Sequence, residues 1–269
     1  MSIITLTTDF GLTDWFAGTM KGVILGINPR AHLVDITHGV PGGDIRAGAF
    51  ALAASYRYFQ RGTIHVAVVD PGVGSDRRAI AVQTANGVFV GPDNGVLSLA
   101  VAREKVESIR RLENARYFLH AVSRSFHGRD IFAPVAAHLS KGLAAAELGP
   151  APADMVMLDW PKPEKGPASI RGEVIYLDRF GNAITNIGND LLSLGGAASL
   201  CVRKKFRVPL KPFYQAVPPG HAVALPGSSG FLEVAVNGGS AAVKLGIKVG
   251  SAVAVNLSSS SRGAEGHRH

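Results

Sequence analysis

In the first 160 residues, short apolar runs alternate with stretches whose apolar residues recur every three to four positions. The first pattern predicts buried strands and the second predicts helices that cover them. The expected elements, in chain order, are a strand at 2–8, a helix from Thr13 to Asn28, a strand at 32–36, a helix from Asp44 to about Phe59, a strand at 63–69 and a helix from Arg129 to Lys141. This order predicts an α/β domain with a parallel or mixed sheet and flanking helices.

Two of these strands end at aspartates. Asp9 follows the strand at 2–8, and Asp70 follows the strand at 63–69. Because the carboxyl ends of parallel strands meet at one edge of a sheet, we expect both carboxylates at the edge where open α/β sheets bind ligands. A carboxylate in the position of Asp9 suits the two hydroxyls of a ribose. No glycine fingerprint for NAD accompanies it.

The pattern changes near residue 159. Residues 159–168 contain three prolines and mixed charges, which indicates a linker. Short strands separated by glycine and proline are then expected at 169–178, 199–203, 205–209, 222–226, 231–236 and 252–256, with a helical stretch at 239–246. The predicted domains are an α/β domain at 1–160, a linker at 161–168, a smaller all-β, barrel-like domain at 169–257 and a disordered tail at 258–269.

Composition limits the class of protein. Hydrophobic residues make up 46% and charged residues 18% of the chain, with no apolar run of membrane-spanning length. One cysteine, Cys201, excludes an internal disulfide, and together with the absence of a signal sequence it favours the cytoplasm. The formal charge is +8, but the basic run at 203–211 carries no RNA-binding signature and is interpreted as a solvated strand face. We therefore expect no nucleic-acid partner and no membrane.

The loop at 69–78 and the segment around His127 hold the candidate catalytic groups. Two glycines follow Asp70 within a tight turn, and Arg77 lies seven residues beyond it. His127 precedes a predicted helix, whose backbone amides disfavour the imidazolium and keep the ring neutral. The spacing alone equally allows a turn capped by Asp70, a surface ion pair of Arg77 and a loop histidine bonded to backbone.

The second domain offers groups suited to an amino acid. Asp178, Phe180 and Asn182 fall within one predicted turn, and Ser228 and Glu233 follow in a later segment. Carboxylate and amide oxygens would hold an ammonium group, and hydroxyls and backbone amides would hold a carboxylate. Ordinary β-turns explain these residues equally well.

The combination of motifs resembles one family across nearly the whole chain. The motifs occur in the family's order as TTDFG, KGVI, VDPGVG with a following arginine, GPDNGVL, FHGRDIFAPVAAHL, DRFGNAITNI and SSGFLEVAVN. The chain is identified by them as similar to the S-adenosyl-L-methionine (SAM) hydroxide adenosyltransferases, relatives of the fluorinase and chlorinase enzymes. This resemblance implies hydrolysis of SAM to adenosine and L-methionine.

The resemblance also implies roles for the residues. Asp70, Arg77 and His127 match the family's hydrolytic triad, and Asp9 would bind the ribose. The remaining contacts to adenine and methionine would come from Asp178, Phe180, Asn182, Ser228 and Glu233. The family forms homotrimers with each site between two subunits. Neither a metal nor a cofactor besides the substrate is expected.

Alternatives remain within and outside the family. Fluorinase-like sequences carry tyrosine and threonine where this chain has Asp70 and Val73, so a halide would meet a negative charge and no hydroxyl here. We therefore expect water as the nucleophile, although a chlorinase-like halogenase and a protein that binds SAM or adenosine without turnover are the other interpretations. Gly42 and Gly43 stand where relatives tend to carry an aromatic residue, so one wall is either missing or supplied by another residue such as Phe213 or Tyr214.

Overall fold

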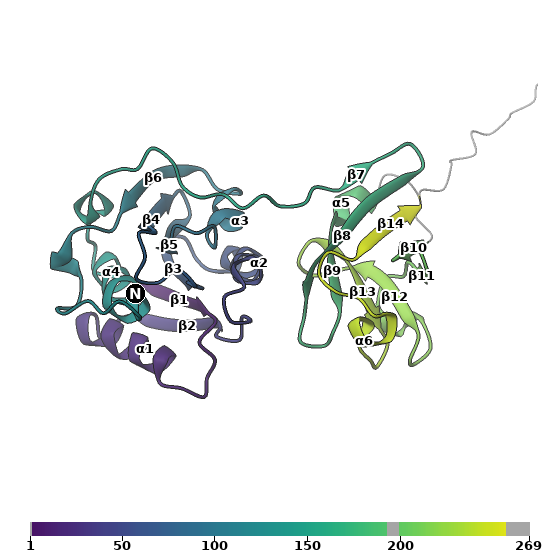
Figure 1. Ribbon diagram of the computed structural model, residues 1–269, viewed down its shortest axis with the longest axis horizontal. Helices are drawn as coiled ribbons and strands as arrows, with labels where there is room; N and C mark the ends of the chain where they lie inside the picture. The colour runs from purple at the N-terminus through teal and green to yellow at the C-terminus, as the bar shows by residue number, and fades with distance from the viewer. Residues whose placement is uncertain (1, 193–198, 257–269) are drawn as a thin grey trace, which may run out of the picture. The chain divides into compact units, whose positions relative to one another are not determined.

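The computed structural model describes residues 2–192 and 199–256 and divides into two compact units (Figure 1). The units comprise Met1–Leu158 and Asp159–His269. The expected tail at 258–269 lies outside the described residues. None of the helices in the described ranges is long and apolar enough to cross a membrane.

The N-terminal unit is built on one mixed sheet. Its strands are β1 (Ile3–Thr8), β2 (His32–Thr37), β3 (Thr63–Val68), β4 (Ala79–Thr84), β5 (Gly87–Pro92) and β6 (Val106–Arg111), in the spatial order β2-β1-β3-β5-β4-β6. Strands β2, β1, β3 and β5 run parallel, and β4 pairs antiparallel with both β5 and β6. This arrangement confirms the predicted α/β class with a mixed sheet.

Helices cover both faces of this sheet (Figure 1). They are α1 (Phe16–Ile27), α2 (Ile45–Ser55), α3 (Ser98–Val101) and α4 (Ala133–Ser140), with short turns at Tyr56–Tyr58, Ala115–Tyr117 and Ala145–Leu148. Helices α1 and α4 pack on each other and bury Met20, Ile24 and Val135 against Ile4 and Val66 of the sheet. Strands β1 and β3 are buried at nearly every position, as expected for strands of a sheet covered on both faces.

The structure corrects three expectations in this unit. Thr13 does not cap α1, which begins at Phe16 with Trp15 as a cap that makes no side-chain bond. The helix expected from Arg129 starts with a π-helical turn at Gly128–Phe132 and becomes α-helical at Ala133. The strands β4, β5 and β6 were not predicted, although β5 is entirely apolar; only β6 mixes charged and apolar residues.

The C-terminal unit is an antiparallel sheet that nearly closes. Its elements are β7 (Glu164–Lys165), β8 (Ser169–Leu177), β9 (Ala183–Gly188), α5 (Asn189–Leu192), β10 (Ser199–Val202), β11 (Phe206–Pro209), a turn at Tyr214–Ala216, β12 (Ala222–Pro226), β13 (Phe231–Val236), α6 (Ala241–Leu245) and β14 (Ala252–Asn256). The strand order is β11-β10-β14-β8-β9-β13-β12, and a bridge between Leu210 and Ala224 joins the two ends. This confirms the predicted barrel-like all-β class.

Two details of this unit differ from expectation. Only part of the basic run is a strand face: Arg207 is exposed on β11, but Arg203 and Lys204 form the hairpin turn between β10 and β11 with positive φ angles. Strand β9 was missed because its residues were interpreted as part of the turn that begins at Asp178.

Candidate active site

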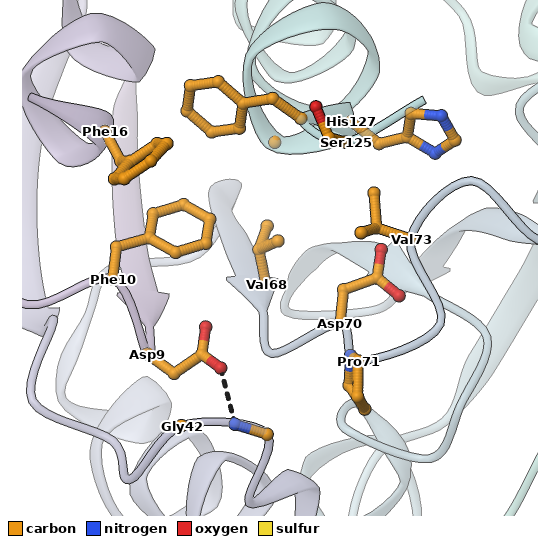
Figure 2. Close-up of a pocket in the computed structure, with 13 residues that line it drawn as sticks. Asp9, Phe10, Phe16, Gly42, Val68, Asp70, Pro71, Val73, Ser125 and His127 are labelled. Carbon is orange, nitrogen blue, oxygen red and sulfur yellow. Dashed lines mark hydrogen bonds between the residues drawn. The ribbon is translucent and has the colours of Figure 1, made fainter. Parts of the chain in front are cut away.

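A cavity of about 580 Å³ opens at the carboxyl ends of β1 and β3 (Figure 2). We call it the carboxylate cavity, and it is lined by Asp9, Phe10, Phe16, Gly42, Gly43, Val68, Asp70, Pro71, Val73, Ser125, Phe126, His127 and Gly128. Figure 2 shows Phe10 and Phe16 on one side and Asp70, Val73 and His127 on the other. The parallel pairing of β1 with β3 brings Asp9 and Asp70 to one edge, as predicted from their positions after the two strands.

Asp70, Arg77 and His127 form one connected cluster. The Arg77 Nε donates to both carboxylate oxygens of Asp70 at 3.0 Å, and Arg77 Nη2 donates to Asp70 Oδ2 at 2.5 Å. The same Nη2 lies 2.7 Å from Nδ1 of His127. The side chains of Arg77 and Asp70 are 11% and 5% exposed, so the ion pair is largely shielded from water. The structure thus brings His127 to Arg77, 50 residues before it in the sequence, and to the nearby Asp70.

The contact with Arg77 sets the tautomer of His127. A guanidinium has donors and no acceptor, so Nδ1 of His127 must accept this bond. The neutral ring therefore carries its proton on Nε2. Burial lowers the pKa of His127, and the positive charge of Arg77 lowers it further. The lowered pKa of His127 favours the neutral ring, and burial and Arg77 are its largest causes.

A glycine allows the loop of Asp70 to approach the segment of His127. Gly74 has a φ angle of +79°, and a Cβ atom there would lie 2.2 Å from the backbone oxygen of Arg124. No other residue type fits this close approach without moving one of the two segments. The loop also closes on itself through a bond from Val73 N to the Asp70 carbonyl at 3.1 Å.

A second network holds Asp9. Its Oδ2 accepts a hydrogen bond from the backbone N–H of Gly43 at 2.8 Å (Figure 2). The preceding Thr8 hydroxyl lies 2.7 Å from Nδ1 of buried His38, whose carbonyl accepts from Gly11 N. The turn around Asp9 is therefore fixed on both sides by buried polar contacts.

Aromatic residues of the same unit form one wall of the carboxylate cavity. Phe126 contacts Phe10 and Phe16 edge to face, with ring centroids 5.6 and 5.1 Å apart. These three rings lie in the N-terminal unit, whereas Phe213 and Tyr214, the expected substitutes for a wall at Gly42 and Gly43, belong to the C-terminal unit. Phe10 and Phe126 stand inside the quoted motifs TTDFG and FHGRD, so the signal was present but was interpreted only as a motif.

The C-terminal unit brings Asp178 and Asn182 together. Asp178 accepts from Phe180 N at 2.9 Å, from Asn182 N at 2.8 Å and from the Asn182 side-chain amide at 2.9 Å. Phe180 itself is 75% exposed. The carboxylate thus shapes the turn and leaves an exposed aromatic ring at its tip.

Glu233 is buried near this turn and Ser228 is exposed. The Tyr214 hydroxyl donates to Glu233 Oε1 at 2.7 Å. Burial raises the pKa of Glu233, and the charge of Asp178 raises it further. Burial and Glu233 likewise raise the pKa of Tyr214 to about 12. The contact between Tyr214 and Glu233 was not predicted, and the hydroxyl of Ser229, next to Ser228 in the sequence, is buried without a hydrogen-bond partner.

The fold and the cavity together define the class of protein. An α/β domain with two carboxylates and an aromatic wall at its strand ends, followed by an antiparallel barrel-like domain, is a small-molecule enzyme architecture. Residues 4–149 match the SAM hydroxide adenosyltransferase N-terminal domain, and residues 172–254 match the C-terminal domain of the same family. The chain belongs to the SAM hydroxide adenosyltransferase family.

Individual relatives agree with this assignment. An (R)-S-adenosyl-L-methionine hydrolase of Salinispora arenicola is 40% identical over 94% of this chain and 97% of its own length. A fluorinase of an Actinoplanes species is 27% identical over 94% of this chain and 97% of its own length. The crystal structure of an uncharacterized conserved protein from Thermotoga maritima superposes with a TM-score of 0.88 at 38% identity, covering 95% of this chain and 99% of that one.

Proposed function

We propose that Asp70, Arg77 and His127 activate the water with which this protein hydrolyses SAM to adenosine and L-methionine. The observation that carries the proposal is the shielded cluster in which Arg77 contacts both Asp70 and His127 beside the carboxylate cavity. Membership of the family and the 40% identity to an (R)-SAM hydrolase support the reaction.

The reaction requires one displacement. The oxygen of water attacks the 5′ carbon of SAM, and the bond from this carbon to sulfur breaks with its electron pair going to sulfur. Methionine leaves as a neutral thioether, and the water gives up one proton. The protein must align the water and receive this proton, for which general-base assistance contributes about 10²–10⁴-fold.

The hydrogen bonds favour Asp70 as the proton acceptor. His127 accepts from Arg77 through Nδ1 and its ring also hydrogen-bonds to the backbone of Ser123, so both contacts hold the ring in place. Asp70 has acceptor positions on both oxygens beyond the three bonds that it receives from Arg77. Arg77 holds both groups in place and stabilises the charge on the carboxylate.

The remaining cavity suits a nucleoside. Asp9 would accept hydrogen bonds from the two ribose hydroxyls, since the backbone N–H of Gly43 engages only its Oδ2 and holds the carboxylate in place. The apolar wall of Phe10, Phe16 and Phe126 would cover the ring system. A volume of about 580 Å³ lies within the range of ligand pockets.

We assign the methionine end to the C-terminal domain, with Asp178, Phe180, Asn182, Ser228 and Glu233 as its contacts. Because the family resemblance implies trimers, these residues would come from a neighbouring subunit. A mixing experiment tests this. Refolding Asp70→Asn chains together with Asp178→Asn chains should restore activity, because some interfaces then combine two intact halves. No recovery in mixed oligomers, or a monomer by light scattering, would contradict the shared site.

Product analysis tests the reaction itself. The purified protein is incubated with each sulfonium epimer of SAM, with and without chloride, and the nucleosides are separated by chromatography. We expect adenosine and methionine both with and without chloride. We also expect the (R) epimer to be preferred, because relatives carry the name (R)-S-adenosyl-L-methionine hydrolase. A 5′-chloro-nucleoside that requires chloride, or recovery of intact SAM, would refute the proposal.

A further inference from the structure

A second cavity, of about 420 Å³, lies at the opposite edge of the N-terminal sheet. It is bounded by residues 56–61 before β3, by the turn between β4 and β5 at Asn86, and by Arg103 and Glu104 after α3. Asp70 and Asp9 follow the other ends of β3 and β1, so this cavity is separate from the carboxylate cavity. We call it the arginine cavity.

Neutral partners orient two of its arginines. Arg57 Nε donates to the Tyr56 hydroxyl at 3.2 Å, and Arg61 Nε donates to Asn86 Oδ1 at 3.1 Å. Such partners fix a guanidinium in place without neutralising its charge. Both side chains keep further N–H groups with which to bind an anion.

The carboxylate of the arginine cavity is engaged by neutral donors. Glu104 accepts from the Tyr56 hydroxyl at 2.8 Å and from the Asn86 amide at 2.7 Å. The lining holds three arginines and one carboxylate, and the charge of Glu104 acts on Arg57. Burial lowers the pKa of Arg103, and the nearby positive charge of Arg57 lowers it further. A bound anion would relieve this repulsion between like charges.

We propose that the arginine cavity binds a small phosphate ester. The guanidiniums of Arg57 and Arg61 match the charge and the several acceptor oxygens of a phosphate group. The rest of the lining is aromatic and amide, with Tyr56, Phe59 and His65 beside Gln60. The volume exceeds what one phosphate needs, so the lining offers room for an organic part of nucleotide size.

Binding is measured by calorimetry with two probes, inorganic phosphate and uridine 5′-monophosphate, at constant ionic strength. Adenosine is present at saturation so that the carboxylate cavity is filled. We expect saturable binding of both probes, with the nucleotide bound more tightly. The double variant Arg57→Gln/Arg61→Gln should bind the nucleotide at least about tenfold more weakly, because two charged donors are lost.

The matched control is Arg30→Gln/Lys141→Gln, which removes two cations from a different depression of the same domain. It should bind both probes like the parent. The rate of SAM hydrolysis should be unchanged in both double variants, which shows that the fold is intact. Equal binding by the parent and the Arg57/Arg61 variant, or no saturable binding by the parent, would overturn the proposal. If uridine 5′-monophosphate binds no more tightly than inorganic phosphate, the inference that the cavity also binds the organic part of the ester is wrong.

Discussion

Replacing Asp70 by asparagine isolates the charge of the proposed base. The side chain keeps its size, and an amide oxygen in the place of Oδ2 still accepts from Arg77 Nε and Nη2. The amide nitrogen then faces Arg77 Nε in the place of Oδ1, where two donors meet and one of the three hydrogen bonds is lost. A hydrogen bond to a charged group contributes about 1.5–3 kcal/mol, which sets the expected loss of stability.

The expected loss of activity is larger than this. Without the carboxylate no anionic acceptor remains beside the water, and the pKa of His127 falls further because Asp70 no longer raises it. Loss of general-base assistance predicts a kcat lower by about 10²–10⁴-fold, which corresponds to roughly 3–5 kcal/mol in the barrier. The KM for SAM should change much less. The assay follows adenosine formation by chromatography across a range of SAM concentrations.

Asp93 provides a matched control. It is a buried aspartate paired with Arg78 Nη2 at 2.6 Å, its other oxygen accepts from Val156 N, and it lines neither cavity. Asp93→Asn should lower the melting temperature to a similar extent and leave kcat unchanged. The reasoning about Asp70 is wrong if its variant keeps kcat within about threefold of the parent, or if both variants lose kcat equally.

Three further predictions concern Asp9, Gly74 and His65. Asp9→Asn should raise the KM for SAM about tenfold with a smaller effect on kcat, because a charged acceptor for the ribose is lost; an unchanged KM in steady-state kinetics would exclude this role. Gly74→Ala should lower both stability and kcat, because its Cβ would collide with the backbone of Arg124. The melting temperature and the turnover rate test this, and a variant as stable and as active as the parent would contradict the close approach. Burial lowers the pKa of His65 from 6.5 to about 4, so between these values the unfolded chain binds a proton that the folded chain does not, and stability falls as the pH drops from 6.5 to 4. His65→Asn should flatten this part of the curve in urea unfolding at several pH values, and an identical slope would refute the assignment.

Local sequence determined the framework of the site. The runs at 3–8 and 63–68 are apolar and β-branched, and strands of this kind become buried wherever a helix covers them. The aspartates directly after them therefore had to reach the same edge once the strands paired in parallel. The ordered motifs carried the family, and the proline-rich stretch near residue 160 marked the change from helices to short strands.

Tertiary structure alone decided how the groups meet. Arg77 and His127 are 50 residues apart, and their 2.7 Å contact depends on the close approach at Gly74. The pKa of His127 follows from burial and from this contact, so no local signal predicted its cause. Phe16 likewise was predicted only as a helix residue, whereas in the structure it lines the carboxylate cavity. Sequence reports the preferences of neighbours along the chain, whereas distances between remote side chains arise only when the sheet and its helices pack.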